Sequence, residues 1–363
     1  MKPSGPPRKL GSVPASMLCQ GKSVLVLVYH VWSIIHAMFR RDFLYSLIAG
    51  STLAQLAQSR PPQPQAASGI FLERPLAGQP HKGKVLLAIE AHSDDVSLES
   101  SGTVAKLIEE GYTGYLVRAT NDDMGDAPGL GTPGTIGDNV LGNERDNAEV
   151  ARVLGCQKHF DLNYSNHRMA DVSVNELISR LIFLIRLLKA DTVVCWDPWA
   201  HDEENPDHYM VAKATEAACW MAGRDHDYAE QFAAGLAPQE VQDKYYFARR
   251  PEITRVVDIS KQIDKKIEAI RANQAKGPGG HYGSHLRAEL AQRHQSLPLL
   301  GDDDATADRN YIKEFLLGHD RELGRQYGVE YAEAFHYIPP GASGADLDPR
   351  VEKYVKEHAV PSK

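Results

Sequence analysis

From residue 84 onward the sequence alternates between short apolar runs and longer amphipathic stretches. Short apolar runs are typical of strands buried on both faces, and apolar positions spaced three and four apart are typical of helices. The predicted strands span residues 85–91, 115–120, 159–163, 191–196, 245–248 and 254–259. The predicted helices span residues 104–110, 143–154, 174–188, 205–222, 261–274 and 309–327. This alternation predicts an α/β fold, a Rossmann-like, mostly parallel sheet flanked by helices.

Two stretches between the predicted elements lack this periodicity. Residues 127–142 are rich in glycine, proline and threonine, and residues 277–283 are rich in glycine. We expect loops there, close to the functional site and involved in substrate choice. The pattern as a whole predicts one domain at residues 70–340 and a C-terminal tail at residues 341–363.

Residues 1–69 do not share the pattern of the domain. The sequence Arg-Arg-Asp-Phe-Leu at residues 40–44 precedes a short apolar region, as in a twin-arginine export signal. A stiff linker at residues 60–65 follows. The alternative is a basic pair beside a membrane segment, and the late position of the pair suggests an over-extended reading frame that truly starts at Met38. We expect an exported, extracytoplasmic protein that uses the twin-arginine machinery and contacts a membrane only through this segment, tethered there if uncleaved.

Composition and charge limit the class of protein. Hydrophobic residues make up 42% of the chain and charged residues 24%, which supports a folded core. The net charge of -8, without a clustered basic face, argues against nucleic acid as a partner. The four cysteines show no paired spacing, and we expect Cys156, Cys195 and Cys219, which lie in apolar segments, to pack as small apolar side chains.

Ionisable residues gather where the first predicted strand ends. His92, Asp94 and Asp95 follow that strand directly, and open α/β sheets place their sites at the carboxyl ends of strands. In a turn, His92 and Asp95 converge on one point with Asp94 beside them, a set that suits a metal ion and its general base. The alternative is that the paired aspartates only cap the next helix or stay solvated.

Two further groups fall at the same predicted edge of the sheet. The second strand leads into an acidic loop with Asp122 and Asp123, and a later strand leads to the helix start at Asn205 and His208. A lone histidine at a helix start is usually a capping or packing residue. Paired with His92 and Asp95, His208 becomes a candidate third metal ligand.

These motifs, in this order, resemble the PIG-L (LmbE-like) family of zinc-dependent N-deacetylases. The family's first motif, Ala-His-Pro-Asp-Asp-Glu, corresponds to residues 91–96, and its second, His-Pro-Asp-His, to residues 205–208. The acidic loop, the predicted helix that carries Arg145 and the sequence at residues 331–335 are also similar. The resemblance spans residues 82–338.

The resemblance implies a zinc hydrolase that removes an N-acetyl or other N-acyl group from an amino sugar or glycoconjugate. It implies His92, Asp95 and His208 as Zn²⁺ ligands, Asp94 as the catalytic base that activates the zinc-bound water, and Arg145, Asp122, Asp123 and Asn205 as substrate-binding residues. For Arg145 the alternative is a surface ion pair with Glu149, its i+4 neighbour.

Three residues depart from the family motifs. Ser93 stands in place of proline, and Val96 in place of a glutamate that could orient a ligand. Asn205 stands where the family often has a histidine that protonates or steadies the intermediate, and an amide cannot transfer a proton. The candidates for this role are His201, His281 and His285. Without a substitute, we expect turnover to fall by ~10²-fold.

Other functions stay open at this point. A non-catalytic carbohydrate-binding protein could retain the fold with a degraded site, which Val96 and Asn205 favour. An amidase acting on a non-sugar N-acyl conjugate would need the same zinc chemistry. A nucleotide-binding enzyme is disfavoured, because no Gly-x-Gly-x-x-Gly motif follows the first predicted strand.

Overall fold

A computed structural model describes residues 69–124, 135–247, 252–275, 279–340 and 349–361 of the chain. The predicted export signal and linker lie outside these described residues. Among the described helices, none combines the length and the hydrophobicity that crossing a bilayer requires.

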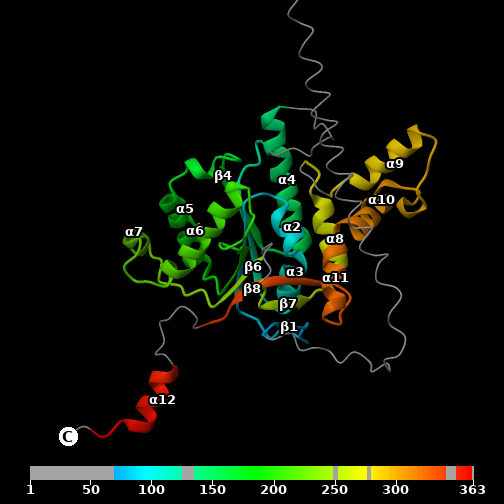
Figure 1. Cartoon of the computed structure of the whole chain (residues 1–363). Helices are drawn as coiled ribbons and strands as arrows, with labels where there is room; N and C mark the ends of the chain where they lie inside the picture. The colour runs from blue at the N-terminus through cyan, green and yellow to red at the C-terminus, as the bar shows by residue number, and fades with distance from the viewer. Residues whose placement is uncertain (1–68, 125–134, 248–251, 276–278, 341–348, 362–363) are drawn as a thin grey trace, which may run out of the picture. The chain divides into compact units, whose positions relative to one another are not determined.

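One eight-stranded sheet organises the described residues (Figure 1). Its strands, in spatial order, are β1 (Phe71–Glu73), β7 (Arg255–Asp258), β8 (Ala332–Ile338), β6 (Asp243–Phe247), β5 (Thr192–Trp196), β2 (Val85–Glu90), β3 (Thr113–Thr120) and β4 (Lys158–Tyr164). Every pairing is parallel except the two made by β8, which runs antiparallel to β6 and β7. The predicted mostly parallel sheet is confirmed.

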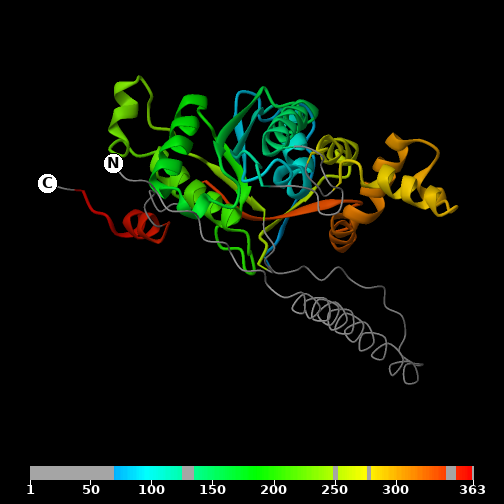
Figure 2. The same ribbon diagram turned by 90° about the horizontal axis from the view of Figure 1, so that it is seen from above.

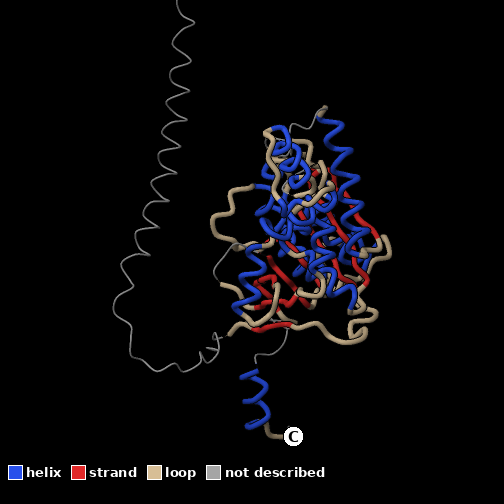
Figure 3. Tube along the Cα trace, turned by 90° about the vertical axis from the view of Figure 1, so that its right-hand side faces the viewer, coloured by secondary structure: helices blue, strands red, loops and turns tan. Residues whose placement is uncertain are grey.

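Helices cover both faces of the sheet, as the strands enclosed among helices in Figure 3 show. One face carries α5 (Val174–Leu188) and α6 (Pro206–Ala222), and the other carries α2 (Asp95–Glu99), α3 (Ser101–Glu109), α4 (Ile136–Leu154) and α8 (Ile263–Ala272) (Figures 1 and 2). The other helices are α7 (Ala229–Ala233), α9 (Tyr282–Gln292), α10 (Asp304–Tyr311), α11 (Gly318–Gln326) and α12 (Pro349–His358), with shorter turns at Met169–Asp171, Pro298–Leu300 and Ile312–Leu316. The predicted α/β class is confirmed.

The central strand β2 positions the site. Its residues Leu86 to Ile89 are fully buried, because helices pack on both of its faces. From β2 the chain first builds β3 and β4 on one side, and then crosses to build β5 and β6 on the other. The carboxyl ends of β2 and β5 therefore flank a topological switch point, where open α/β sheets bind their ligands.

The predicted loop at residues 127–142 is wrong over its second half. Helix α4 begins at Ile136, and Thr135 caps it by accepting a hydrogen bond from the backbone N–H of Asp138 at 3.2 Å. The Asp138 carboxylate accepts the Thr135 backbone N–H at 2.8 Å in return, which completes a capping box. Gly142 lies inside this helix, where an added Cβ would be 2.9 Å from the side chain of Ala275, so this glycine serves close packing. Residues 127–134 lie outside the described residues.

Two other predicted segments are also interrupted. The helix expected at residues 309–327 is divided into α10 and α11 by the π-helical turn at Ile312–Leu316. The glycine-rich loop expected at residues 277–283 already ends at Tyr282, where α9 begins, and residues 276–278 lie outside the description. The predicted C-terminal tail contains α12.

Candidate metal centre

Three side chains that the sequence singled out converge beside the switch point. The Nδ1 atom of His92 lies 3.0 Å from Nε2 of His208 and 3.7 Å from Oδ1 of Asp95. Nε2 of His208 lies 3.2 Å from the same Asp95 oxygen. We call this group the ligand trio, because it offers two imidazole nitrogens and one carboxylate oxygen to a single point.

Local structure explains how distant residues meet there. His92 follows β2 directly, and Asp95 is the first residue of α2, so the turn between strand and helix brings both side chains to one side. His208 lies in the first turn of α6, the helix that follows β5. Pro206 at the first helical position and the cap formed by Asn205 fix where that helix begins.

A second layer of polar groups holds each member of the trio in place. Asp207 lies 3.1 Å from Nε2 of His92, and Glu203 lies 3.0 Å from Nδ1 of His208. The second carboxylate oxygen of Asp95 accepts the backbone N–H groups of Ala91 and His92, both at 2.9 Å. The ring of Trp196 stacks on His208 at 4.1 Å between centroids. The inward atoms of the trio, which face one another, are the ones that a metal ion would bind.

Electrostatics favour a charged carboxylate within this cluster. Burial by itself would raise the pKa of Asp95, but the charges and hydrogen bonds of His208 and His92 outweigh it and hold that pKa well below its usual value. For His208, burial would lower the pKa, and the neighbouring Asp95 carboxylate raises it above the ordinary value. Asp207 has a lowered pKa, because hydrogen bonds from His92 and backbone N–H groups exceed the effect of its burial.

The residues present fit a zinc ion. Four-coordinate Zn²⁺ binds nitrogen and oxygen at about 2.0–2.2 Å, so its ligand atoms lie roughly 3.3 Å apart. The three separations within the trio scatter around that value. Each histidine also meets a carboxylate at its outer nitrogen, as metal-binding histidines commonly do. Three protein ligands leave a position for water, the arrangement of a catalytic site rather than a structural one.

Asp94, the predicted base, lies at the N-cap position of α2 and is 7% exposed. The pKa of Tyr282, at the start of α9, is raised by its burial first, then by Tyr311 and by the charge of Asp94. The role of Asp94 as a base stays a prediction.

The predicted substrate-binding residues lie in different environments. Asp122 is fully buried and accepts the backbone N–H of Ser93 at 3.0 Å while pairing with Arg118. Asp123 accepts hydrogen bonds from Ser165 and from the backbone of Asn166. In the structure, both carboxylates thus brace the loops around the trio. Whether they also contact substrate stays a prediction.

Arg145 and Asn205 have structural surroundings of their own. Arg145 is exposed and lines a depression between α4 and α8. The alternative of a pair with Glu149 is not realised, because Glu149 pairs with Arg152 at 2.6 Å. Asn205 uses its side-chain oxygen to accept the backbone N–H of Asp207 at 3.0 Å, so it acts at least as a helix cap.

The departures from the family motifs have local compensations. Ser93 donates its backbone N–H to Asp122 and its hydroxyl to Asn143, both at 3.0 Å, and proline could make neither bond. Val96 is buried in the core, and its backbone N–H donates to the carboxyl group of Glu90 at 3.0 Å. A buried carboxyl group thus stands behind the motif despite the missing glutamate.

Of the candidate proton donors, His201 and His285 are exposed, while His281 is half-buried with its ring 4.6 Å from that of His285. Sequence reasoning missed His167, whose ring lies 6.4 Å from the ring of His92. Its backbone N–H donates to Asp207 at 2.6 Å, which fixes it next to the trio. Its position after β4, at the same edge of the sheet, was the available signal.

The PIG-L family model, described as GlcNAc-PI de-N-acetylase, matches residues 87–219, which include the whole ligand trio. Diacetylchitobiose deacetylase of Thermococcus kodakarensis is 27% identical over 196 residues, 54% of this chain and 71% of the relative. The 1D-myo-inositol 2-acetamido-2-deoxy-alpha-D-glucopyranoside deacetylase of Mycolicibacterium smegmatis is 23% identical over 265 residues, 61% of this chain and 89% of the relative.

Solved structures show the same fold. The N,N'-diacetylchitobiose deacetylase from Pyrococcus horikoshii superposes with a TM-score of 0.57 at 21% identity, covering 74% of this chain and 88% of that chain. GalB, the 4-carboxy-2-hydroxymuconate hydratase from Pseudomonas putida KT2440, superposes with a TM-score of 0.51 at 18% identity, covering 71% and 97%. Since one fold supports two reactions, the fold by itself does not decide the activity.

Proposed function

We propose that the chain is an amide hydrolase that removes the acetyl group from an N-acetylated amino sugar or glycoconjugate with the help of Zn²⁺, as its match to the PIG-L family model and its similarity to named deacetylases support. The observation that carries the proposal is the ligand trio, whose three inward atoms lie within 4.8 Å of one another. The names of the relatives support the amide of an amino sugar as the substrate class.

When bound by the trio, Zn²⁺ would lower the pKa of a water molecule and polarise the amide carbonyl. Asp94 would accept the proton of the attacking water, because it lies in the same turn as His92 and Asp95, whereas Asp207 and Glu203 lie at the outer nitrogens of the two histidines. Asp207 keeps the His92 ring turned with Nδ1 inward, and Glu203 places its charge 3.0 Å from the outer nitrogen of His208. Burial of His92 and Asp95 limits access of bulk water and strengthens these interactions.

The departing amine needs a proton, which Asn205 cannot supply. We propose His167 as a further candidate beside His201, His281 and His285, since its backbone is fixed to Asp207 and its ring is close to His92. Each histidine is tested by a single alanine variant. Loss of the true proton donor removes the alkaline limb of the pH–rate profile, because that limb records deprotonation of the general acid. If all four profiles keep this limb, none of these histidines is the donor.

The non-catalytic alternative rests on Val96 and Asn205. Against it stands the intact ligand trio, while Glu90 accepts the backbone N–H of Val96 and Asn205 caps α6. The catalytic proposal therefore has the stronger support. An amidase acting on a non-sugar conjugate differs only in substrate, and acetate release from N-acetyl sugars compared with N-acyl amino acids separates the two.

The test of the proposed function is metal content and acetate release of the purified full chain. We expect about one zinc per chain in the wild type. Asp95→Asn and His208→Ala should lose both the metal and the acetate release. His226→Ala is the matched control, since His226 is exposed and pairs with its neighbour Asp225. A wild-type chain that stays metal-free after incubation with zinc would contradict the proposal.

A further inference from the structure

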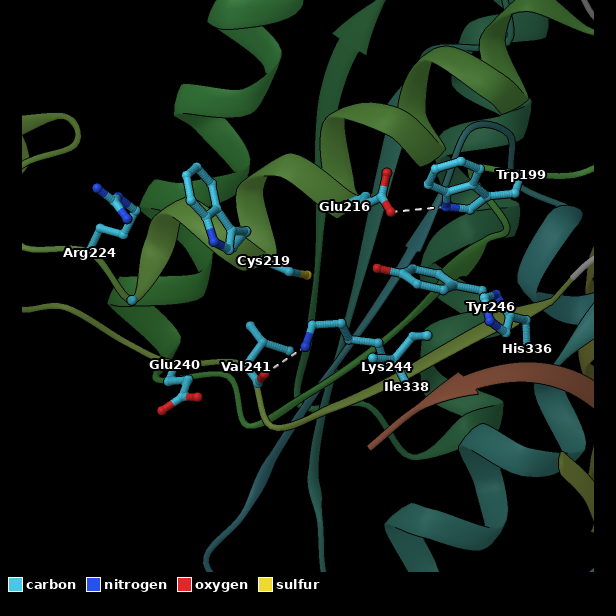
Figure 4. A pocket seen from close by; sticks show the side chains of 12 residues that line it. Trp199, Glu216, Cys219, Arg224, Glu240, Val241, Lys244, Tyr246, His336 and Ile338 are labelled. Carbon is cyan, nitrogen blue, oxygen red and sulfur yellow. Dashed lines mark hydrogen bonds between the residues drawn. The ribbon is translucent and has the colours of Figure 1, made fainter. Parts of the chain in front are cut away.

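A cavity of about 360 Å³, separate from the ligand trio, lies beside α6 (Figure 4). Its walls come from the second half of α6, from β6 and β8, and from the loop after β5. Its lining includes Trp199, Glu216, Trp220, Lys244, Tyr246 and His336. We call it the α6 pocket. It contains none of the ligand trio, and its volume lies in the range of small-molecule sites.

Two exposed indole rings mark the rim of the α6 pocket. Trp199 is 59% exposed and Trp220 is 55% exposed, although tryptophan is among the residues that proteins usually cover. Both rings are held: Trp199 Nε1 donates to Glu216 at 3.0 Å, and the guanidinium of Arg224 lies 4.6 Å from the Trp220 ring centre. Large, fixed and exposed aromatic rings are a binding feature rather than a packing one.

Polar groups lie between these rings. Figure 4 shows the Tyr246 hydroxyl pointing toward Glu216 and Cys219, and this buried hydroxyl has no hydrogen-bond partner among the described residues. The ammonium group of Lys244 donates to the carbonyl of Val241 at 3.1 Å, and the carboxylate of Glu216 holds Trp199. An apolar helix would cover these charges without satisfying them. A ligand with a stackable ring and several hydroxyl groups satisfies both kinds of contact.

Helix α6 connects this pocket to the ligand trio. His208 and Glu216 lie on the same helix, eight positions and therefore about 12 Å apart along its axis. The loop after β5 gives a second connection, because Trp196 stacks on His208 and the next residue, Asp197, faces His336 of the pocket at 3.6 Å. A substrate of more than one sugar ring can span this separation.

We propose that the α6 pocket is a second sugar-binding subsite, which holds a further ring of an oligosaccharide or glycoconjugate while the N-acylated ring lies at the ligand trio. This inference rests on the proposed function for the trio. The rim rings Trp199 and Trp220 stack on the distal sugar ring, and Glu216 and Lys244 bind its hydroxyl groups. The chain therefore prefers oligosaccharides to a single N-acetylated sugar.

The test compares N-acetylglucosamine with its β-1,4-linked trimer. Binding of both is measured by calorimetry on the full-length Asp94→Asn chain, and acetate release on the otherwise wild-type chain. We expect Trp199→Ala and Trp220→Ala each to reduce the preference for the trimer three- to tenfold, the effect of losing one aromatic contact. Phe183→Ala is the matched control: Phe183 is an exposed aromatic residue on α5 that lines a different cavity, so the preference should persist.

The outcomes separate the subsite from the proposed function. Trimer binding that needs both tryptophans, without acetate release from any sugar, would support the subsite and contradict the deacetylase. Acetate release with no preference for the trimer would support the deacetylase and contradict the subsite. Tryptophan variants that melt like the wild type and keep the preference overturn the subsite. The subsite is also overturned if the tryptophan variants differ from wild type in mass by light scattering but not in sugar binding, since the rim would then be a protein-binding face.

Discussion

Asp207 connects the ligand trio to the loop that follows β4. One of its oxygens lies 3.1 Å from His92 and accepts the backbone N–H of His167, and the other accepts the backbone N–H of Met169. One carboxylate thus fixes the tautomer and orientation of a ligand and also the position of a neighbouring histidine. The family resemblance placed His92 and His208 at the metal but assigned nothing to Asp207.

Asp207→Ala should lower zinc affinity by about 10- to 100-fold, the usual cost of removing a carboxylate behind a metal-binding histidine. The measurement is competition with a chelator of known affinity. Asp171→Ala is the control, since Asp171 is 76% exposed and lies in the same region of the chain. Equal affinities in the two variants would show that Asp207 does not support the metal.

Glu90 gives a prediction for pH. Its complete burial raises the pKa of its carboxyl group well above the usual value, and the nearby Asp95 charge adds to this. Above about pH 4.3 the unfolded chain ionises this group while the folded chain keeps it protonated, so stability falls as pH rises from that value toward the raised pKa.

Glu90→Gln removes this loss and keeps an acceptor for the backbone N–H of Val96. The measurement uses chelator-treated protein between pH 4.5 and 8. We expect the free energy of unfolding of the variant to exceed that of wild type by a margin that grows with pH. The margin grows by at most ~1.4 kcal/mol per pH unit and stops growing at the raised pKa. Urea unfolding at several pH values measures it. The exposed Glu144→Gln variant serves as the control and should show no such trend. A parallel pH dependence for wild type and Glu90→Gln would show that Glu90 ionises normally.

Among the elements, helix α6 contributes to both the ligand trio and the α6 pocket. Its cap, its inward histidine and one wall of the α6 pocket lie along a single helix. The cap depends on the Asn205 side chain, which accepts the backbone N–H of Asp207. Asn205→Ala should therefore lower the free energy of unfolding by about 1 kcal/mol, and Asn205→Ser should restore most of it. Denaturant titration of both variants checks this; equal losses in both would mean that capping is not what Asn205 contributes.

Most of the sheet could be predicted from the sequence, because its strands are short runs that are apolar on both faces. The run at residues 85–91 became β2, and the run at residues 191–196 became β5. The edge strand β1 was not predicted, since its three residues are half exposed and carry no periodicity. The start of α4 was missed because Gly137 and Gly142 looked like loop residues, while a capping box outweighed their low helix propensity.

The convergence of the ligand trio could also be predicted, because strand order and strand ends determine which residues share an edge. The carboxylates at the outer nitrogens of the two histidines could not be predicted. Glu203 and Asp207 reach the trio through side-chain geometry at the start of α6, which spacing alone does not specify. The α6 pocket was missed for a similar reason, since its walls combine one helix, two strands and a loop that are far apart in the sequence.

For the molecule as a whole, we propose export through the twin-arginine route, on the basis of the sequence at residues 40–44. Arg40→Lys combined with Arg41→Lys should hold the protein in the cytoplasm, because that route reads the arginine pair itself. Fractionation followed by immunoblotting is the measurement, and Lys22→Arg in the same N-terminal region is the control. An exported double-lysine variant would rule out this route.

The ligand trio draws on segments 116 positions apart in the chain, so it does not exist until β2 and β5 pair. Contacts of such long range form late, since the loop between them must close first. A metal ion bound by the trio would link the two segments across the middle of the sheet. It would raise the free energy of unfolding by about 2.7 kcal/mol at a free concentration of 100 times its dissociation constant. Metal binding would therefore report completed folding, because a chain in which β2 and β5 have not paired has no complete metal site.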